Sequence, residues 1–414
     1  MKFKKFGYIL RLMFILLLCF ILNKRNYEKI ETKNTNIFSE NVSNGKKEEY
    51  EKGYDLPIED IVRDEAIEDC KNVMRQIRDI YKNASKGDSI NVVLTDETLL
   101  DMKKIIKDMG NPVTSTVHYA TMENYKKMEN FLENSQKGKT GNVILYEIST
   151  DGGITREKFI YDGADMYVLS ARGTWGDSDK IVISYISFTR LNDWNYSERG
   201  WFCYEVCVPE PPEVTEIVDG SYLIRVRPLS EKCIEYSKKY VLPLGYRGNN
   251  LLCSNWNIEK MDELDYNGMF EYLYAMKYGD RFQSESYPNG IPVQEFESVI
   301  MEYLPVTEEQ IREWAFYDEE HQTYDWTSLG CGNYAPTFFG ASIPEVVDIK
   351  ENTDGTVTLE VDAVCDMVVC SDAVITHKVR MKIEENGSFK YLGNEILDNG
   401  IEDIPAYQYR VKRI

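Results

Sequence analysis

Six short segments between residues 143 and 227 alternate apolar and polar side chains with the period of two that a β-strand requires. They cover residues 143–149, 154–161, 165–171, 181–189, 201–208 and 221–227. Turn-forming sequences such as TDGG, YDGAD and VDGS separate most of them. Because short turns join neighbouring strands in opposite directions, this part of the chain is predicted to form an antiparallel meander.

Three segments with helical periodicity precede the meander. The first places apolar residues at three-to-four spacing between Ile67 and Tyr81. The second, TDETLLDMKKIIKDMGNP, begins with polar capping residues and ends at Gly110 and Pro112. The third is TMENYKKMENFLENSQKGK. We expect these three helices to cover one face of the sheet.

The pattern becomes helical again after Pro228, in LSEKCIEYSKKY and DYNGMFEYLYAMKYG. Pro292 marks the start of a further helix, and Thr307 with Gln310 forms a capping box at the next one. Strands are then predicted near residues 345–350, 356–364, 373–384 and 388–397. Helices followed by a curved antiparallel sheet indicate an α+β fold of the NTF2-like or cystatin-like kind in this half.

The N-terminus contains the apolar run LRLMFILLLCFILNKRNY, which follows a basic head as in export signals. Lipidation of Cys19 requires a small residue before it, and Leu18 stands there instead. Peptidase cleavage also requires small residues, which the sequence after Leu22 lacks. Residues 6–22 are long enough to span a bilayer at the short end of the range, so they are predicted to stay as a signal-anchor helix.

Basic residues flank the apolar run almost equally on both sides, so the positive-inside rule does not decide its direction. The short basic head favours a cytoplasmic N-terminus, which places the body outside the cytoplasm as a single-pass cell-membrane protein. The predicted order is an anchor, a polar stalk, a helix-plus-meander α+β domain and a second α+β domain. Their boundaries are residues 1–23, 24–57, 58–228 and 229–414.

The net charge excludes one class of partner. The first 30 residues carry +6, so the remainder of a chain whose net charge is −21 carries −27. A body this acidic repels phosphate backbones and anionic lipid surfaces. Nucleic acid is therefore not an expected partner, and the membrane is expected to be contacted only through residues 6–22.

The cysteines and acidic clusters predict no metal or cofactor site. Cys365 and Cys370 bracket four residues between two alternating segments, so a hairpin could bring them together as a disulfide, or both could remain thiols. No C-x2-C pair occurs, and no acidic cluster continues into a calcium-binding loop. The sequence also lacks phosphate-loop and dinucleotide fingerprints, so no cofactor is expected.

Three residues are candidates for a functional pocket: His377, Cys331 and His321. His377 shares the apolar face of a predicted strand and could line a cavity, although a core histidine with satisfied partners explains the pattern better. Cys331 lies between two glycines, ten residues after His321, as a nucleophile and its base could. A loop cysteine that awaits a disulfide partner explains the same sequence and is favoured, since no hydrolase motif is present.

Several stretches together carry a resemblance: TMENYKKMENFLE, YVLPLGYRGNN, FEYLYAMKYG and THKVRMKIEENGSFKYLGNEIL. In this order they resemble an uncharacterised family of membrane-anchored extracytoplasmic proteins from Gram-positive anaerobes. The resemblance implies an exported, anchored protein. Because the family is a domain of unknown function, it supplies no catalytic residues.

Two hypotheses for function follow from the sequence. The first is a non-enzymatic binding or interaction module that presents a pocket or sheet edge to a peptide, glycan or envelope partner. The alternative is a cell-envelope hydrolase that uses Cys331 or His377. The first is preferred because the sequence holds no complete catalytic set.

Overall fold

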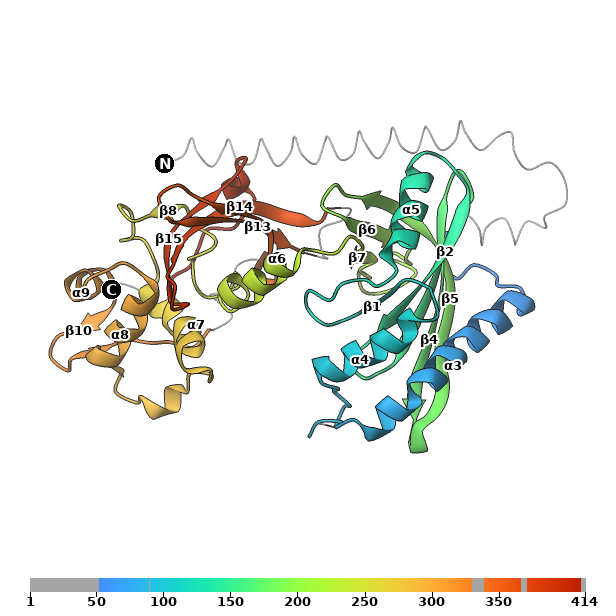
Figure 1. Cartoon of the computed structure of the whole chain (residues 1–414), viewed down its shortest axis with the longest axis horizontal. Helices are drawn as coiled ribbons and strands as arrows, with labels where there is room; N and C mark the ends of the chain where they lie inside the picture. The colour runs from blue at the N-terminus through green and yellow to red at the C-terminus, as the bar shows by residue number, and fades with distance from the viewer. Residues whose placement is uncertain (1–51, 89, 330–338, 366–370, 411–414) are drawn as a thin grey trace. The chain divides into compact units, whose positions relative to one another are not determined.

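The computed structural model describes residues 52–88, 90–329, 339–365 and 371–410 (Figure 1). The predicted anchor, the stalk up to residue 51, Cys331 and Cys370 all lie outside the described residues. Within the described part of the chain, no helix combines the length and apolar character needed to cross a membrane. The chain from Lys52 onwards forms one compact unit.

Seven strands form the first sheet, and they follow one another in chain order. They are β1 (Val113–Ser115), β2 (Gly141–Ile148), β3 (Ile154–Tyr161), β4 (Met166–Gly176), β5 (Lys180–Tyr196), β6 (Trp201–Val206) and β7 (Ser221–Arg225). Strands β2 to β7 pair antiparallel, as the alternation predicts. β1 differs because it pairs parallel with β2. The helix between β1 and β2 returns the chain to the same end of the sheet, which makes the pairing parallel.

Helices cover both faces of this sheet instead of one. They are α3 (Asp60–Asn83), α4 (Asp96–Lys107) and α5 (Tyr125–Gln136). In β2, Val143 and Leu145 belong to the same apolar cluster as residues of α5. Tyr146 and Ile148 point to the opposite face and cluster with residues of α3 and α4. Both sets of alternate positions in β2 are largely apolar, which is the pattern of a strand covered on both faces, and the expectation of one covered face overlooked it.

An ion pair between a buried arginine and a half-buried aspartate fixes α3 to the sheet. The side chain of Arg156 in β3 is fully buried, and its Nε donates a hydrogen bond to Oδ2 of Asp69 in α3 over 2.9 Å. Its Nη2 makes an ionic contact with the same oxygen at 2.8 Å, and Glu65 lies further away at 3.7 Å. A buried guanidinium needs such a partner, so this pair sets the position of α3 along the strands.

The second part of the described chain is also a mixture of helices and antiparallel strands, so the α+β class is confirmed. Its helices are α6 (Glu231–Tyr236), α7 (Tyr266–Tyr278), α8 (Val293–Tyr303) and α9 (Glu308–Trp314). A five-stranded antiparallel sheet has the order β12 (Ile343–Glu351), β13 (Val357–Val364), β14 (Ala373–Ile383), β15 (Phe389–Ile396), β8 (Trp256–Asn257). A small sheet contains β10 (Tyr317–Asp318), β11 (Thr323–Tyr324) and β9 (Ile291–Pro292).

The local signals for these elements are largely confirmed. Pro292 stands directly before α8, and Thr307 and Gln310 form the predicted capping box at α9. The four longer strands of the five-stranded sheet lie where the alternation predicts them. Strand β8 and the small sheet were not predicted, because strands of two residues are too short to show an alternating pattern.

The last described residue, Arg410, is buried against α7 and the loop before it. Its Nε donates to the carbonyl oxygen of Gly248 over 3.0 Å, and its Nη2 contacts the carboxylate of Glu271. Gly248 has a φ of +66°, and a Cβ at this position would collide with the guanidinium. Glycine is therefore required here both by the backbone and by the close approach of Arg410.

Candidate functional site

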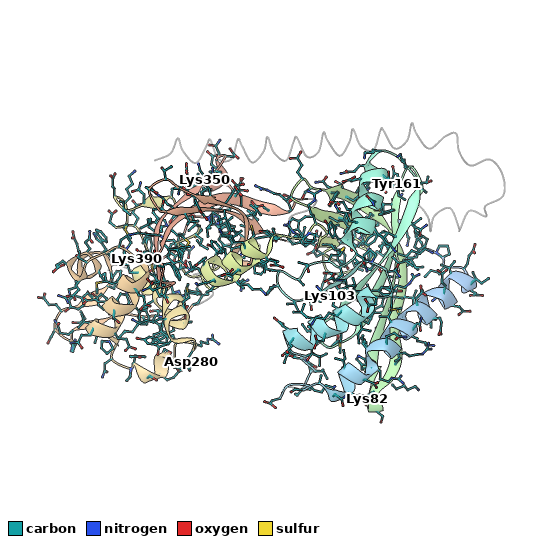
Figure 2. The ribbon with its side chains drawn as sticks, viewed as in Figure 1. Lys82, Lys103, Tyr161, Asp280, Lys350 and Lys390 are labelled. Carbon is teal, nitrogen blue, oxygen red and sulfur yellow. The ribbon has the colours of Figure 1, made fainter. Side chains whose placement is uncertain are left out.

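A cavity of about 320 Å³ lies between the first sheet, the segment that follows β1, and the start of β12. The segment after β1 covers residues 116–121 and is held from two sides. Nζ of Lys103 in α4 (Figure 2) donates to the carbonyl oxygen of Thr121 over 2.5 Å. The hydroxyl of Tyr119 donates to the carbonyl oxygen of Pro344 in β12. This wall of the cavity is therefore tied to both α4 and β12.

Two glutamates of the first sheet line the cavity on neighbouring strands. Leu145 of β2 pairs with Glu157 of β3, so Glu147 and Glu157 are diagonal neighbours on one face of the sheet. Burial raises the pKa of Glu157 to about 8, and the negative charge of Glu147 adds to this shift. Burial also raises the pKa of Glu147, against the attraction of Arg172. The hydroxyl of Tyr204 contacts Glu157 at 3.4 Å.

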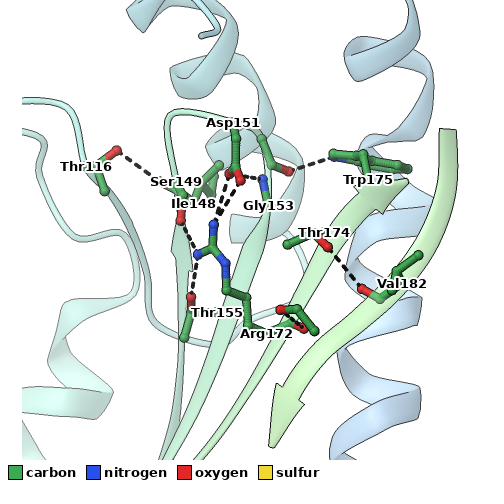
Figure 3. Close-up of polar contacts among 12 residues, drawn as sticks. Thr116, Ile148, Ser149, Asp151, Gly153, Thr155, Arg172, Thr174, Trp175 and Val182 are labelled. Atoms are coloured by element: carbon green, nitrogen blue, oxygen red, sulfur yellow. Dashed lines mark hydrogen bonds and ion pairs between the residues drawn. The ribbon is translucent and has the colours of Figure 1, made fainter. Parts of the chain in front are cut away.

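Arg172 of β4 makes hydrogen bonds with the β2–β3 turn and with β3 (Figure 3). Its Nη1 donates to Oγ of Ser149 over 2.7 Å and to Oγ1 of Thr155 over 3.2 Å. Its Nη2 donates to the carboxylate of Asp151 over 2.9 Å. The donors of Arg172 are thus occupied by the β2–β3 turn and Thr155. Arg172 lowers the pKa of Glu147 only through its charge.

A second cluster lines the cavity around Arg225 of β7. Its Nη1 lies 3.2 Å from Oε1 of Glu345 in β12 and donates to the carbonyl oxygen of Arg199 over 2.7 Å. Trp201 donates from Nε1 to the same Glu345 oxygen over 3.3 Å, and its ring centre lies 5.1 Å from the guanidinium carbon. Burial raises the pKa of Glu345 to about 7 despite the attraction of Arg225. Arg225 is therefore held firmly in place.

Two cavity-lining residues each contain a buried polar atom without a partner. Within the described residues, neither Oγ of Ser115 nor Nε of Arg225 makes a hydrogen bond, although both atoms are buried. Ser115 is 7% exposed, and both residues line the cavity. Ser115 pairs with Ile148, whose side chain lies on the sheet face opposite Glu147 and Glu157. Because neither atom has accessible surface, neither can bond a group held in the cavity.

His377 and His321, the two histidines that the sequence analysis named as pocket candidates, do not line the cavity. His377 in β14 is fully buried, with Nε2 at 2.8 Å from the hydroxyl of Tyr246 and Nδ1 at 2.6 Å from Oδ1 of Asn394. Burial lowers its pKa to about 4. His377 is not among the residues that line the cavity. These are the surroundings of a satisfied core histidine.

His321 and the predicted disulfide lie elsewhere. His321 is exposed in the turn between β10 and β11, where its Nδ1 lies 2.7 Å from Oδ2 of Asp318. The two histidines thus have separate sets of partners. Cys365 is buried, and its proposed partner Cys370 is outside the described residues, as is Cys331. In the part of the chain that the structure describes, no group of three or more His, Cys, Asp or Glu residues could hold a metal ion.

The residues that line the cavity were missed by the sequence analysis, although one signal for them existed. Glu147 and Glu157 occupy the alternate positions that carry Leu145 and Phe159, which are buried. An acidic residue in phase with the apolar face of a strand indicates a buried carboxyl group. Ser115 and Arg225 carry no comparable signal, because only the tertiary fold brings them to this cavity.

Residues 63–410 match the model of DUF6070, which is described as a family of unknown function. No curated protein and no solved structure matches the chain.

Proposed function

The chain belongs to this family of unknown function, and from that premise we propose that it is a non-enzymatic binding protein whose cavity takes a polar group of an envelope ligand. The observation that supports this is the pair of glutamates on neighbouring strands, Glu147 and Glu157, in the wall of a cavity of about 320 Å³. A ligand that donates hydrogen bonds to these carboxyl groups offsets the cost of burying them. The apolar part of the lining adds affinity without fixing orientation.

A substitution that removes a charge from the cavity wall tests this proposal. Glu157→Gln keeps the shape of the side chain and removes its charge, so it should weaken ligand retention by the full-length chain. Glu205→Gln is the matched control, because Glu205 lies in β6 and does not line the cavity. Envelope extract is passed over both variants and the wild type, and native mass spectrometry identifies the small molecules retained. Equal retention by wild type and Glu157→Gln would contradict the proposal.

We also propose that residues 6–22 anchor the protein in the cell membrane with its body outside the cytoplasm. The support is the uninterrupted apolar run after a basic head. A reporter that is active only outside the cytoplasm, fused after residue 50, should be active. A reporter active only inside the cytoplasm at the same position would reverse the orientation, and mature protein that begins after Leu22 would show that the segment is removed.

For the C-terminal half, residues 229–414, we propose an NTF2-like or cystatin-like domain, separate from a first domain over residues 58–228. The support is the packing of α8 against β15 within one apolar cluster that also contains β12, β13 and β14. Separate expression of the two halves tests the division. Cooperative thermal unfolding of each half alone is expected, and loss of cooperativity in both would contradict it.

A further inference from the structure

We propose that the cavity binds a primary amine, whose ammonium group is held by Glu147, Glu157 and Thr114. This inference rests on the proposed binding function and assigns the chemical class of the ligand. It follows from the positions of three polar side chains on one face of β1, β2 and β3, all of which line the cavity of about 320 Å³.

The strand register places these three side chains on the same face of the sheet. Thr114 of β1 pairs with Glu147 of β2, so the hydroxyl and the carboxyl group are neighbours. Leu145, two residues before Glu147, pairs with Glu157 of β3, which puts the second carboxyl group diagonal to the first. Val143 and Leu145 identify this face, because both cluster with residues of α5.

The acceptor atoms of the three side chains keep accessible surface. Glu157 is 9% exposed, and its Oε1 accepts from the hydroxyl of Tyr204 over 3.4 Å. Within the described residues, its Oε2, both carboxyl oxygens of Glu147 and the hydroxyl of Thr114 make no hydrogen bond, yet none of them is among the unpartnered atoms that lack accessible surface. These atoms can therefore accept hydrogen bonds from a group in the cavity.

The two carboxyl groups have no cation of the protein in contact with them. Within the described residues, neither Glu147 nor Glu157 makes an ion pair. Arg172 attracts Glu147 through its charge, but its donors are occupied by the β2–β3 turn and by Thr155. A carboxyl group as buried as that of Glu157 needs either a charged partner or a proton. A ligand cation supplies the partner that the chain does not.

A primary ammonium group matches this set of acceptors. It has three N–H donors on one compact charge, one for each carboxyl group and one for the hydroxyl of Thr114. A neutral hydroxyl has a single donor and brings no charge, and a quaternary ammonium group has no donor at all. Leu145 lies directly opposite Glu157 on the same face and lines the cavity, so the carbon chain of the amine meets an apolar surface beside the carboxyl pair.

Binding of the ammonium group should release protons. Glu157 holds a proton at neutral pH because burial raises its pKa to about 8. A bound cation favours the ionised carboxylate and expels this proton.

Other titratable groups surround the carboxyl pair. Those that face it from the neighbouring strands are Arg172, Tyr185, Tyr204 and Tyr222. Burial raises the pKa of each of these three tyrosines, so they stay protonated near neutral pH. The lining of the cavity also contains His118, Tyr119, Arg225 and Glu345. Because some of these groups can exchange protons too, the proton of Glu157 has to be identified with a variant.

Matched probes test the inference by titration calorimetry on the full-length protein in non-ionic detergent, in buffers that are not amines. Butylamine carries the ammonium group, butan-1-ol replaces it with a hydroxyl, and butyltrimethylammonium keeps the charge without an N–H. Butylamine should bind at least about tenfold more tightly than either analogue. Its binding enthalpy should vary with the ionisation enthalpy of the buffer, as proton release requires. No binding of butylamine, or an analogue that binds as tightly, would overturn the proposal.

A fourth probe distinguishes two sources of the amine. Nα-acetyl-lysine amide presents the same butylammonium group on a peptide unit. Binding as tight as that of butylamine would assign the lysine side chain of a peptide as the ligand, and weaker binding would assign a free small amine. Both results agree with an amine site.

Variants locate the ammonium group. Glu157→Gln keeps the shape of the side chain and cannot ionise, so butylamine should bind at least about tenfold less tightly and release fewer protons. Glu147→Gln should also weaken butylamine binding, and it provides an independent measurement if Glu157→Gln does not fold. Glu205→Gln in β6, outside the cavity lining, is the matched control and should bind butylamine as the wild type does. Unchanged butylamine affinity in both cavity variants would overturn the assignment.

Two results separate the amine from the proposed binding function. If butylamine does not bind, but the wild type retains an envelope molecule that Glu157→Gln does not, the amine is wrong and the binding function stands. If butylamine binds equally to wild type and Glu157→Gln, and both retain the same envelope molecules, the ligand lies outside this cavity and both proposals are overturned.

Discussion

Nδ1 of His377 lies 2.6 Å from Oδ1 of Asn394, and this contact fixes the position of the histidine proton. The amide nitrogen of Asn394 donates to the carbonyl oxygens of Leu252 and Ser254, so the orientation of the amide group is settled. Its Oδ1 can only accept, which requires a proton on Nδ1 of His377. Nε2 is then the acceptor for the hydroxyl of Tyr246.

His377 should keep this tautomer in solution. Nitrogen NMR at pH 7 should show the ring of His377 protonated on Nδ1 alone, with the signal assigned by its loss in His377→Gln. Because burial lowers the pKa to about 4, from 6.5 for a free ring, the unfolded chain binds this proton more readily. The contribution of His377 to stability is therefore complete above about pH 6.5 and is lost as pH falls through 4. A titration midpoint near 6.5 in the folded protein would contradict the prediction.

Glu157 should affect stability in the opposite direction. Burial raises its pKa from 4.5 to about 8, so the folded state holds the proton more tightly than the unfolded chain. The free energy of unfolding should fall between pH 4.5 and 8, by about 3 to 5 kcal/mol from this group. Glu157→Gln should remove that part of the slope, measured by urea unfolding at several pH values. The same slope in variant and wild type would mean that Glu157 is ionised when folded.

The contact between Asp69 and Arg156 should be important for stability. Asp69→Ala leaves the fully buried guanidinium of Arg156 without its closest partner, and the expected cost is about 2 to 4 kcal/mol of unfolding free energy. Asp79→Ala, at an exposed position of the same helix, is the matched control and should cost no more than about 0.5 kcal/mol. Denaturant unfolding compares them. Similar losses of unfolding free energy in both variants would mean that the substitutions act through the helix itself and that the ion pair makes no contribution.

The capping box at α9 should contribute less to the free energy of unfolding than the contact between Asp69 and Arg156 does. Oγ1 of Thr307 accepts from the backbone N–H of Gln310 over 3.3 Å, and Thr307→Ala leaves that donor to solvent. We expect a loss of about 1 kcal/mol in thermal or denaturant unfolding. Thr307→Ser retains the hydroxyl and should restore most of the stability. Equal losses in the alanine and serine variants would assign the effect to the lost methyl group.

The local elements could be predicted from the sequence because their signals are local. Thr307 and Gln310 are three residues apart, and the alternation in β2 to β7 is visible within each strand. The parallel pairing of β1 could not be predicted, because three residues show no periodicity and the pairing depends on where α5 returns the chain.

The candidate site was less accessible to sequence reasoning. Its lining comes from positions as far apart as Glu147, Arg225 and Glu345, and no spacing rule connects them. Cysteine and histidine residues were chosen as candidates because their side chains take part in many reactions. His377, however, has the hydrogen-bond partners of an ordinary core residue. Buried glutamates in strands look like solvent-facing residues until the phase of the strand is compared with its apolar neighbours.

The burial of Arg410 has a consequence for biosynthesis. Its guanidinium reaches back across 162 positions to the carbonyl oxygen of Gly248, and it also contacts Glu271 in α7. A ribosome holds the most recently added residues inside its exit tunnel, so these contacts cannot form until Arg410 has itself left the tunnel. The surroundings of α7 therefore reach their final state long after α7 has been synthesised.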